Sequence, residues 1–181
     1  NNEELTAILP YSNELFSVLD NLYIIGTMNT ADRSVEALDT ALRRRFVFEE
    51  MQPNYNLKEL NENFFGINLK IVLEKINTRI EKLIDKDHLI GHSFFLNLKT
   101  INDLRNSFEN KIIPLLEEYF YGDFVKIGLI LGKDFVTPKK FNFSFANFDD
   151  DSLFTDLDDR DAFIIKTPEK DEDFINALIN I

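Results

Sequence analysis

The sequence predicts an α/β segment over residues 1–56, a mainly helical domain after residue 56, and a β-rich or irregular tail over residues 133–181. Three observations predict this fold class. An apolar run at 22–25 is followed at once by polar residues, as at the end of a buried strand. From Leu57 onward, apolar residues recur at helical spacing. In the tail, phenylalanines alternate with Asn, Ser and Lys, which favours short strands or an extended chain.

The α/β segment is predicted to run strand, helix, strand. The first strand covers 22–25, the helix covers 35–44 with Ser34 as its N-cap, and the second strand covers 46–51. Before them, two short apolar clusters are separated by a turn-prone break at 10–13. The polar residues after the first strand therefore fall at its carboxyl edge, which is where ligands bind in open α/β sheets.

The helical domain is predicted to have a break at 66–68 and a long amphipathic helix over 101–120, which Pro114 kinks or splits. A further short helix is predicted over 124–131, closed by Gly132. In the tail, the acidic stretch 149–161 is most simply a solvated loop, because its spacing lacks the Gly and terminal Glu of an EF-hand loop. A final amphipathic helix is predicted over 171–181. No function is assigned to the tail.

Composition excludes several classes of protein. The 181 residues contain 20 Lys and Arg against 32 Asp and Glu, a net charge of −12, which argues against a general DNA-binding surface. Cys is absent, so neither a disulfide framework nor a thiolate metal site is possible, and a reducing cytoplasm is the expected location. No leader and no apolar run long enough to cross a membrane is found, so we expect no membrane contact.

Two groups of polar residues are candidates for chemistry. The first follows the strand at 22–25 and comprises Asn29, Thr30, Asp32 and Arg33, which together are suited to holding a phosphate and its attacking water. The alternatives are an Asn that turns the chain and a solvated Asp–Arg pair that contributes little. The second group is the arginine run 43–45 in the last turn of the predicted helix. The alternative to a catalytic role is that these cations are placed there by the helix dipole, which favours positive charge at this end.

Two blocks of sequence resemble one protein family. Gly26-Thr-Met-Asn-Thr-Ala-Asp-Arg-Ser34, followed by Leu38-Asp-Thr-Ala-Leu-Arg-Arg-Arg-Phe46, resembles the signature of the McrB-type AAA+ proteins, the GTPase motor subunits of modification-dependent restriction systems. Ile90-Gly-His-Ser-Phe-Phe95 and Ile113-Pro-Leu-Leu-Glu-Glu-Tyr-Phe120 resemble the lid region of that family. The resemblance implies the C-terminal portion of an AAA+ P-loop NTPase domain. Residues 1–56 would be the end of the core, 57–132 the lid, and 133–181 an extension of unassigned role.

The resemblance also implies roles for individual residues. Asn29 resembles the sensor-1 residue, which orients the attacking water and contacts the γ-phosphate. Arg43 and Arg44 resemble arginine fingers, which neutralise charge on the nucleotide of the next subunit. Arg45 abuts the strand and is expected to be structural. Thr30, Asp32 and Arg33 are expected to shape the loop or to face a partner.

His92 is the one lid residue among the candidates. No Gly-Ala-Arg-like sensor motif stands in its segment, so we favour a packed or hydrogen-bonded histidine at the lid hinge over a nucleotide contact. The chain has only 2 His, which makes a histidine-based metal site improbable.

The same resemblance implies GTP and Mg²⁺ as cofactors, with ATP as an alternative nucleotide. Neither a G-x-x-x-x-G-K-[ST] loop nor a strand ending in Asp-Glu before Asn29 occurs here, so the sequence reads as a fragment that is inactive alone. Implied partners are further copies in a ring, expected to be a hexamer, a McrC-like nuclease subunit, and DNA bound through a domain outside this chain. The rival hypothesis is a non-enzymatic AAA+-like assembly module.

Overall fold

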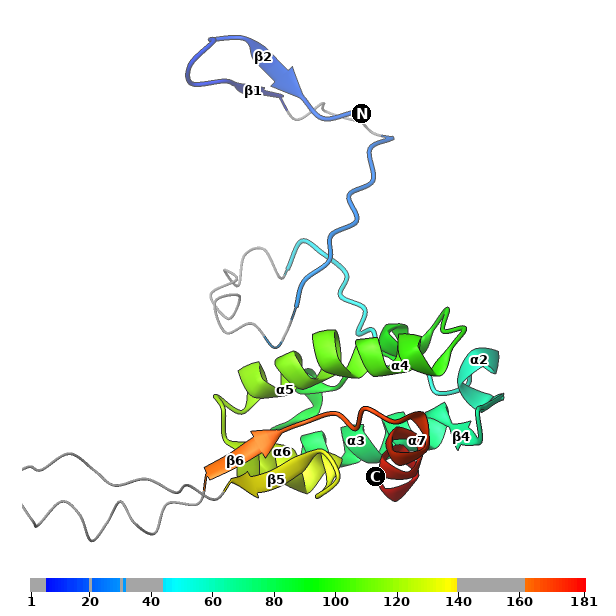
Figure 1. The fold of residues 1–181 in the computed structure, drawn as a ribbon. Helices are drawn as coiled ribbons and strands as arrows, with labels where there is room; N and C mark the ends of the chain where they lie inside the picture. Colours follow the sequence, from blue (N-terminus) through cyan, green and yellow to red (C-terminus); the bar gives the residue numbers. More distant parts are fainter. Residues whose placement is uncertain (1–5, 20, 30, 32–43, 140–161) are drawn as a thin grey trace, which may run out of the picture. The chain divides into compact units, whose positions relative to one another are not determined.

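The computed structural model describes residues 6–19, 21–29, 31, 44–139 and 162–181. It forms two compact units, Asn1–Leu38 and Asp39–Ile181, each with its own contacts (Figure 1). The helix predicted over 35–44 and the acidic stretch 149–161 lie outside the described residues, except for Arg44. Within the described ranges, no helix is long and apolar enough to cross a membrane.

The first unit contains one antiparallel hairpin. Strand β1 (Thr6–Ile8) pairs with β2 (Leu15–Ser17), with Thr6 opposite Ser17. The turn-prone break predicted at 10–13 is confirmed as the connection between these strands, where Asn13 has a φ of 56°. A left-handed backbone is tolerated by Asn better than by most residues, which explains its place in this turn.

The strands predicted at 22–25 and 46–51 are wrong for this structure. Residues 22–29 and 47–54 have no helix or strand, and Ile25 and Val47 are 94% and 100% exposed. A strand persists only when its backbone groups are paired and its apolar side chains are covered. Among the residues that the structure describes, no strand pairs with either segment. Both segments have the apolar pattern of a strand, but neither is paired with another strand in the described residues.

The second unit begins its regular structure with helix α2 (Lys58–Asn61) and a tight hairpin of β3 (Asn63–Phe64) and β4 (Ile67–Asn68). The hairpin is the break predicted at 66–68, and Gly66 turns it with a φ of 85°, a value that favours glycine. Helix α3 (Leu69–Leu83) follows directly, and the side chain of its N-cap Asn68 accepts a hydrogen bond from Ile71 N.

Short 3₁₀ turns, η2 (Lys86–His88) and η3 (His92–Phe95), lead to the long helical stretch predicted over 101–120. This stretch is divided into α4 (Ile101–Ser107), a π-helical turn (Phe108–Ile112) and α5 (Ile113–Tyr119). Pro114 has no N–H to donate, and the π turn immediately precedes it, where Ile113 N bonds to Phe108 O instead. Of the two predicted alternatives, the structure shows a split: the π turn before Pro114 divides the stretch into α4 and α5.

Helix α6 (Phe124–Leu131) is confirmed with the predicted bounds, and Gly132 ends it with a φ of 89°. Strands β5 (Val136–Lys139) and β6 (Ala162–Ile165) then pair antiparallel, with Val136 opposite Ile165. The last helix, α7 (Asp171–Asn180), confirms the amphipathic helix predicted for the end of the chain. Figure 1 shows α7 beside α3 and β4, within the same unit as the earlier helices.

The core of this unit is built on four phenylalanines that are at most 1% exposed. The ring of Phe108 lies 6.0 Å from Phe95, 5.7 Å from Phe135 and 5.9 Å from Phe174, measured between centroids. Arg105 of α4 covers the outside, 5.1 Å from the Phe174 ring, and its guanidinium donates to the Asp171 carboxylate. The core therefore continues past residue 132 into the predicted tail.

The capping carboxylates of α4 and α6 predict a pH dependence of stability. Backbone N–H groups of Lys99 and Thr100 donate to Asp103, and Lys126 N donates to Asp123, so both carboxyl pKa values lie below the usual 3.8. A lowered pKa in the folded state contributes stability that is full above pH 3.8 and is lost as the pH falls below it.

We therefore expect Asp103→Ala to destabilise the chain at pH 6 and to have a shrinking effect as the pH falls below 3.8. Urea unfolding of both chains at several pH values measures this. The exposed Glu109→Ala serves as the control. A difference that stays constant, or grows, on acidification contradicts the prediction.

Candidate functional site

The predicted phosphate-binding residues are only partly within the described residues. Asn29 is exposed in an irregular segment, and its Oδ1 accepts a hydrogen bond from Ala31 N at 3.2 Å. This is the local turn that Asn commonly makes, so the oxygen shapes the loop. Within the described residues, this turn is the hydrogen bond that the Asn29 side chain makes.

The other members of the first candidate group, Thr30, Asp32 and Arg33, lie outside the described residues, as does Arg43. Arg44 is exposed in a turn. Asn29 and Arg44 belong to different units, so the structure provides no geometry between them.

His92 takes part in the connection through which the chain enters the helical unit. Asn54 N donates to His92 Nδ1 at 3.1 Å. This hydrogen bond ties the His92 ring to the entry segment, defined here as residues 54–57.

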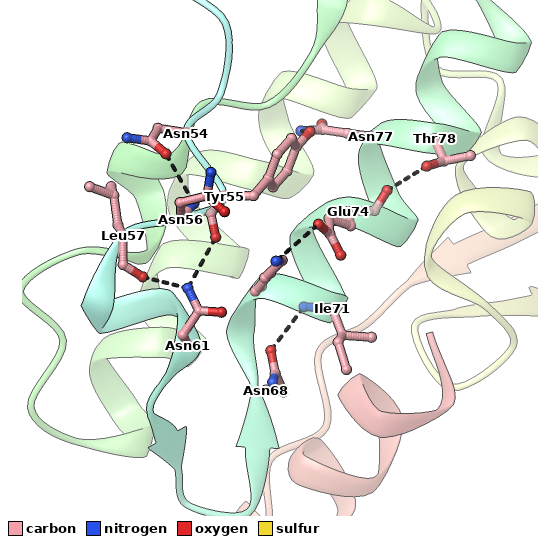
Figure 2. A network of polar contacts seen from close by, with 11 residues as sticks. Asn54, Tyr55, Asn56, Leu57, Asn61, Asn68, Ile71, Glu74, Asn77 and Thr78 are labelled. Carbon is pink, nitrogen blue, oxygen red and sulfur yellow. Dashed lines mark hydrogen bonds and ion pairs between the residues drawn. The ribbon is translucent and has the colours of Figure 1, made fainter.

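Asn77 of α3 ties the same segment to the interior. It is 2% exposed, and its Nδ2 donates to Tyr55 Oη and to Ile90 O, each at 2.9 Å. Its Oδ1 accepts from Ile90 N at 2.7 Å. Figure 2 shows the Tyr55 ring reaching from the entry segment to Asn77. One buried amide thus pairs both of its N–H groups and its oxygen by joining two segments that are distant in sequence.

Asn61 of α2 holds the backbone of the entry segment from the other side. Its Nδ2 donates to Tyr55 O at 3.1 Å and to Leu57 O at 2.8 Å (Figure 2). Asn56 N donates to Asn54 Oδ1 at 3.0 Å within the segment.

The sequence analysis missed Asn77. The signal was present, because Asn77 occupies the apolar stripe of α3 between Leu73 and Ile80, where an amide is unexpected. A polar residue on a buried stripe requires partners, and here those partners lie in segments far apart in sequence.

The remaining titratable contacts are structural. His88 Nδ1 lies 2.6 Å from Asp85 Oδ1, and this hydrogen bond holds the pKa of Asp85 below its usual value. The His88 ring packs edge-on against Tyr119 at 4.8 Å, and burial raises the pKa of the Tyr119 hydroxyl. Across the described ranges, no group of three or more His, Asp or Glu side chains is arranged to hold a metal ion.

Comparison with known proteins locates the helical unit in a family. Residues 68–128, which run from the end of β4 into α6, match the family model described as the alpha-helical lid domain of McrB.

Two curated relatives extend this match beyond the lid. The chain is 38% identical over 141 residues to the "Type IV methyl-directed restriction enzyme EcoKMcrB subunit" of Escherichia coli (strain K12), covering 67% of this chain and 31% of the relative. It is 30% identical over 159 residues to the "Type II restriction enzyme BsuMI component YdiS" of Bacillus subtilis (strain 168), covering 81% of this chain and 44% of the relative. The chain therefore spans less than half the length of either relative.

Proposed function

Because this chain belongs to the McrB-type restriction subunits and carries their alpha-helical lid domain, we propose that it is part of an AAA+ motor that hydrolyses GTP in a DNA restriction system. The observation that carries the proposal is the lid match over 68–128, on a unit whose helices share one buried core. Both relatives are named as parts of restriction enzymes, which supports membership of a multi-subunit assembly.

In this proposal the chain supplies groups that act on a nucleotide held mainly by residues outside it. Asn29 orients the attacking water through its amide, and Arg43 or Arg44 reaches the nucleotide of a neighbouring subunit. Thr30, Asp32 and Arg33 shape the loop that follows Asn29 or face a partner. GTP, or ATP as the alternative, binds with Mg²⁺ through a phosphate loop and acidic residues that do not occur in these 181 residues.

The proposal extends to partners. An arginine that acts on another subunit requires a ring, which we take to be a hexamer, and a McrC-like nuclease subunit provides cleavage. DNA recognition belongs to a domain outside these 181 residues, because their net charge of −12 does not favour binding to phosphates.

The test is nucleotide turnover by the parent protein with its partner subunit. Asn29→Ala removes the amide that positions water, and we expect kcat for GTP or ATP to fall on the order of 100-fold. Asn110→Ala is the matched control, because Asn110 is exposed and its side chain bonds only to Asn106 O in the described structure. Unchanged turnover in Asn29→Ala would show that Asn29 does not act in hydrolysis. Absent turnover in the wild type would favour the non-enzymatic assembly module.

The 181-residue chain alone is expected to bind neither GTP nor ATP, because it lacks the phosphate loop. Titration calorimetry with each nucleotide measures this directly. Measurable affinity of the isolated chain would contradict the proposed division of the site.

A further inference from the structure

The entry segment 54–57 is bound to the helical unit far more firmly than the chain before it. We infer that Asn77 is a positioning residue, which fixes this segment so that the lid pivots as one body about residues 51–53. The consequence for turnover depends on the proposed function, whereas the mechanical statement does not.

The first step is the burial of Asn77. An amide at 2% exposure is tolerated only when its donors and acceptor are paired. Both N–H groups are committed, one to Tyr55 Oη and one to Ile90 O, and the oxygen is committed to Ile90 N. Moving Tyr55 away from α3 would leave a buried donor unpaired, which is unfavourable. Tyr55 therefore moves with α3.

The second step is that independent contacts hold three of the four residues of the same segment. His92 accepts from Asn54 N, and Asn61 donates to the carbonyls of Tyr55 and Leu57. These anchors come from three places in the sequence, namely α2, α3 and the segment at 90–92. A segment held from three sides has no freedom to bend within itself.

The third step is the contrast with the preceding residues. Residues 47–53 have no helix or strand, and Met51 is 88% exposed. Glu50 of this stretch forms an ion pair with Lys86 at 3.1 Å, with side chains 54% and 60% exposed, and its carboxylate also accepts from the exposed Gln52 side chain. Exposed pairs contribute little, so this one opens at small cost. The easiest place to bend is therefore 51–53, between the exposed pair and the anchored segment.

The fourth step connects the pivot to turnover. Lid motions in enzymes are absorbed by a few loop residues, and they complete the catalytic arrangement. If Tyr55 is loosened, the lid samples more orientations and fewer subunits are competent at any time. The nucleotide-binding groups lie elsewhere in the chain or outside it, so we expect kcat to fall while KM stays unchanged.

The experiment uses the parent protein with Tyr55→Phe, which keeps the ring and removes the hydroxyl, and Asn77→Asp, which keeps an acceptor for Ile90 N. Tyr121→Phe is the matched control, because its ring is 85% exposed. Hydrogen exchange is followed at residue resolution, and kcat and KM for GTP and ATP are measured on the same samples.

In the wild type we expect slow exchange at the Asn54 and Ile90 amides and fast exchange at the amides of residues 49–52. Tyr55→Phe should speed exchange at Asn54 about tenfold, as the loss of one hydrogen bond allows. It should also lower kcat several-fold with KM unchanged, and Tyr121→Phe should do neither. Asn77→Asp should also speed exchange and lower kcat. If Asn77→Asp fails to fold, the result for Tyr55→Phe alone tests the inference.

Two outcomes overturn the inference. Fast wild-type exchange at Asn54 would show that the entry segment is not anchored. Faster exchange in Tyr55→Phe with unchanged kcat would show that Asn77 does not act as a positioning residue in turnover. The proposed function would be unaffected by that result. Absence of any turnover in the wild type would instead overturn the proposed function, and the exchange data would still decide whether the segment is anchored.

Discussion

Phe108→Ala is expected to lower the free energy of unfolding of the helical unit by about 3–5 kcal/mol, the usual cost of emptying an aromatic site in a core. The Phe108 side chain is fully buried and touches three other phenylalanine rings, which come from η3, from the turn before β5 and from α7. These elements cannot collapse together without losing their own contacts, so the cavity stays open. Chemical denaturation of the 181-residue chain measures the loss.

Two variants give this measurement its controls. Phe108→Leu retains much of the volume and should cost less than the alanine variant. Phe65→Ala alters a ring that is 54% exposed in the β3–β4 turn, and we expect a change below about 1 kcal/mol. Equal losses for Phe65→Ala and Phe108→Ala would mean that the four phenylalanines do not form the core described here.

The helical elements were largely predictable from sequence because each follows a local rule. Each signal lies within about one to four turns of the helix it marks. The signals are the apolar spacing of α3, Asp123 and Gly132 at the two ends of α6, and the apolar face of α7. The split near Pro114 was also predictable, because a missing N–H has the same effect in any helix. What the sequence did not specify was the form of the split, a π turn rather than a kink.

Features that depend on distant partners were not predictable in the same way. The strands expected at 22–25 and 46–51 have the right side chains, but a strand is completed by neighbours that its own sequence does not name. The role of Asn77 depends on Tyr55 and Ile90, which are 22 and 13 residues away. The packing of Phe174 with Phe108 likewise joins the predicted tail to the lid across a long separation. The sequence pattern therefore identified the helices, whereas the strand pairing and the contacts between elements came from the structure.

Removal of the proposed arginine finger is expected to have the largest effect on activity. If Arg43 or Arg44 neutralises charge on the γ-phosphate of the next subunit, its change to Ala should lower kcat of the parent assembly by about 10³–10⁵-fold. Arg45→Ala is the matched control, since we expect Arg45 to be structural.

A mixing experiment separates action on a neighbour from action within one subunit. An Asn29→Ala subunit retains its arginines, and an Arg43→Ala subunit retains Asn29, so their mixed ring contains sites where an intact Asn29 faces an intact arginine from the neighbour. Turnover should therefore recover on mixing two variants that each have low turnover alone. The same design applied to Arg44→Ala identifies which arginine is the finger. If mixing restores nothing although mixed rings form, the arginine acts within its own subunit, and the ring site proposed here is wrong. If neither arginine variant loses turnover, the alternative interpretation of the sequence holds, in which the run 43–45 interacts with the dipole of the helix predicted over 35–44.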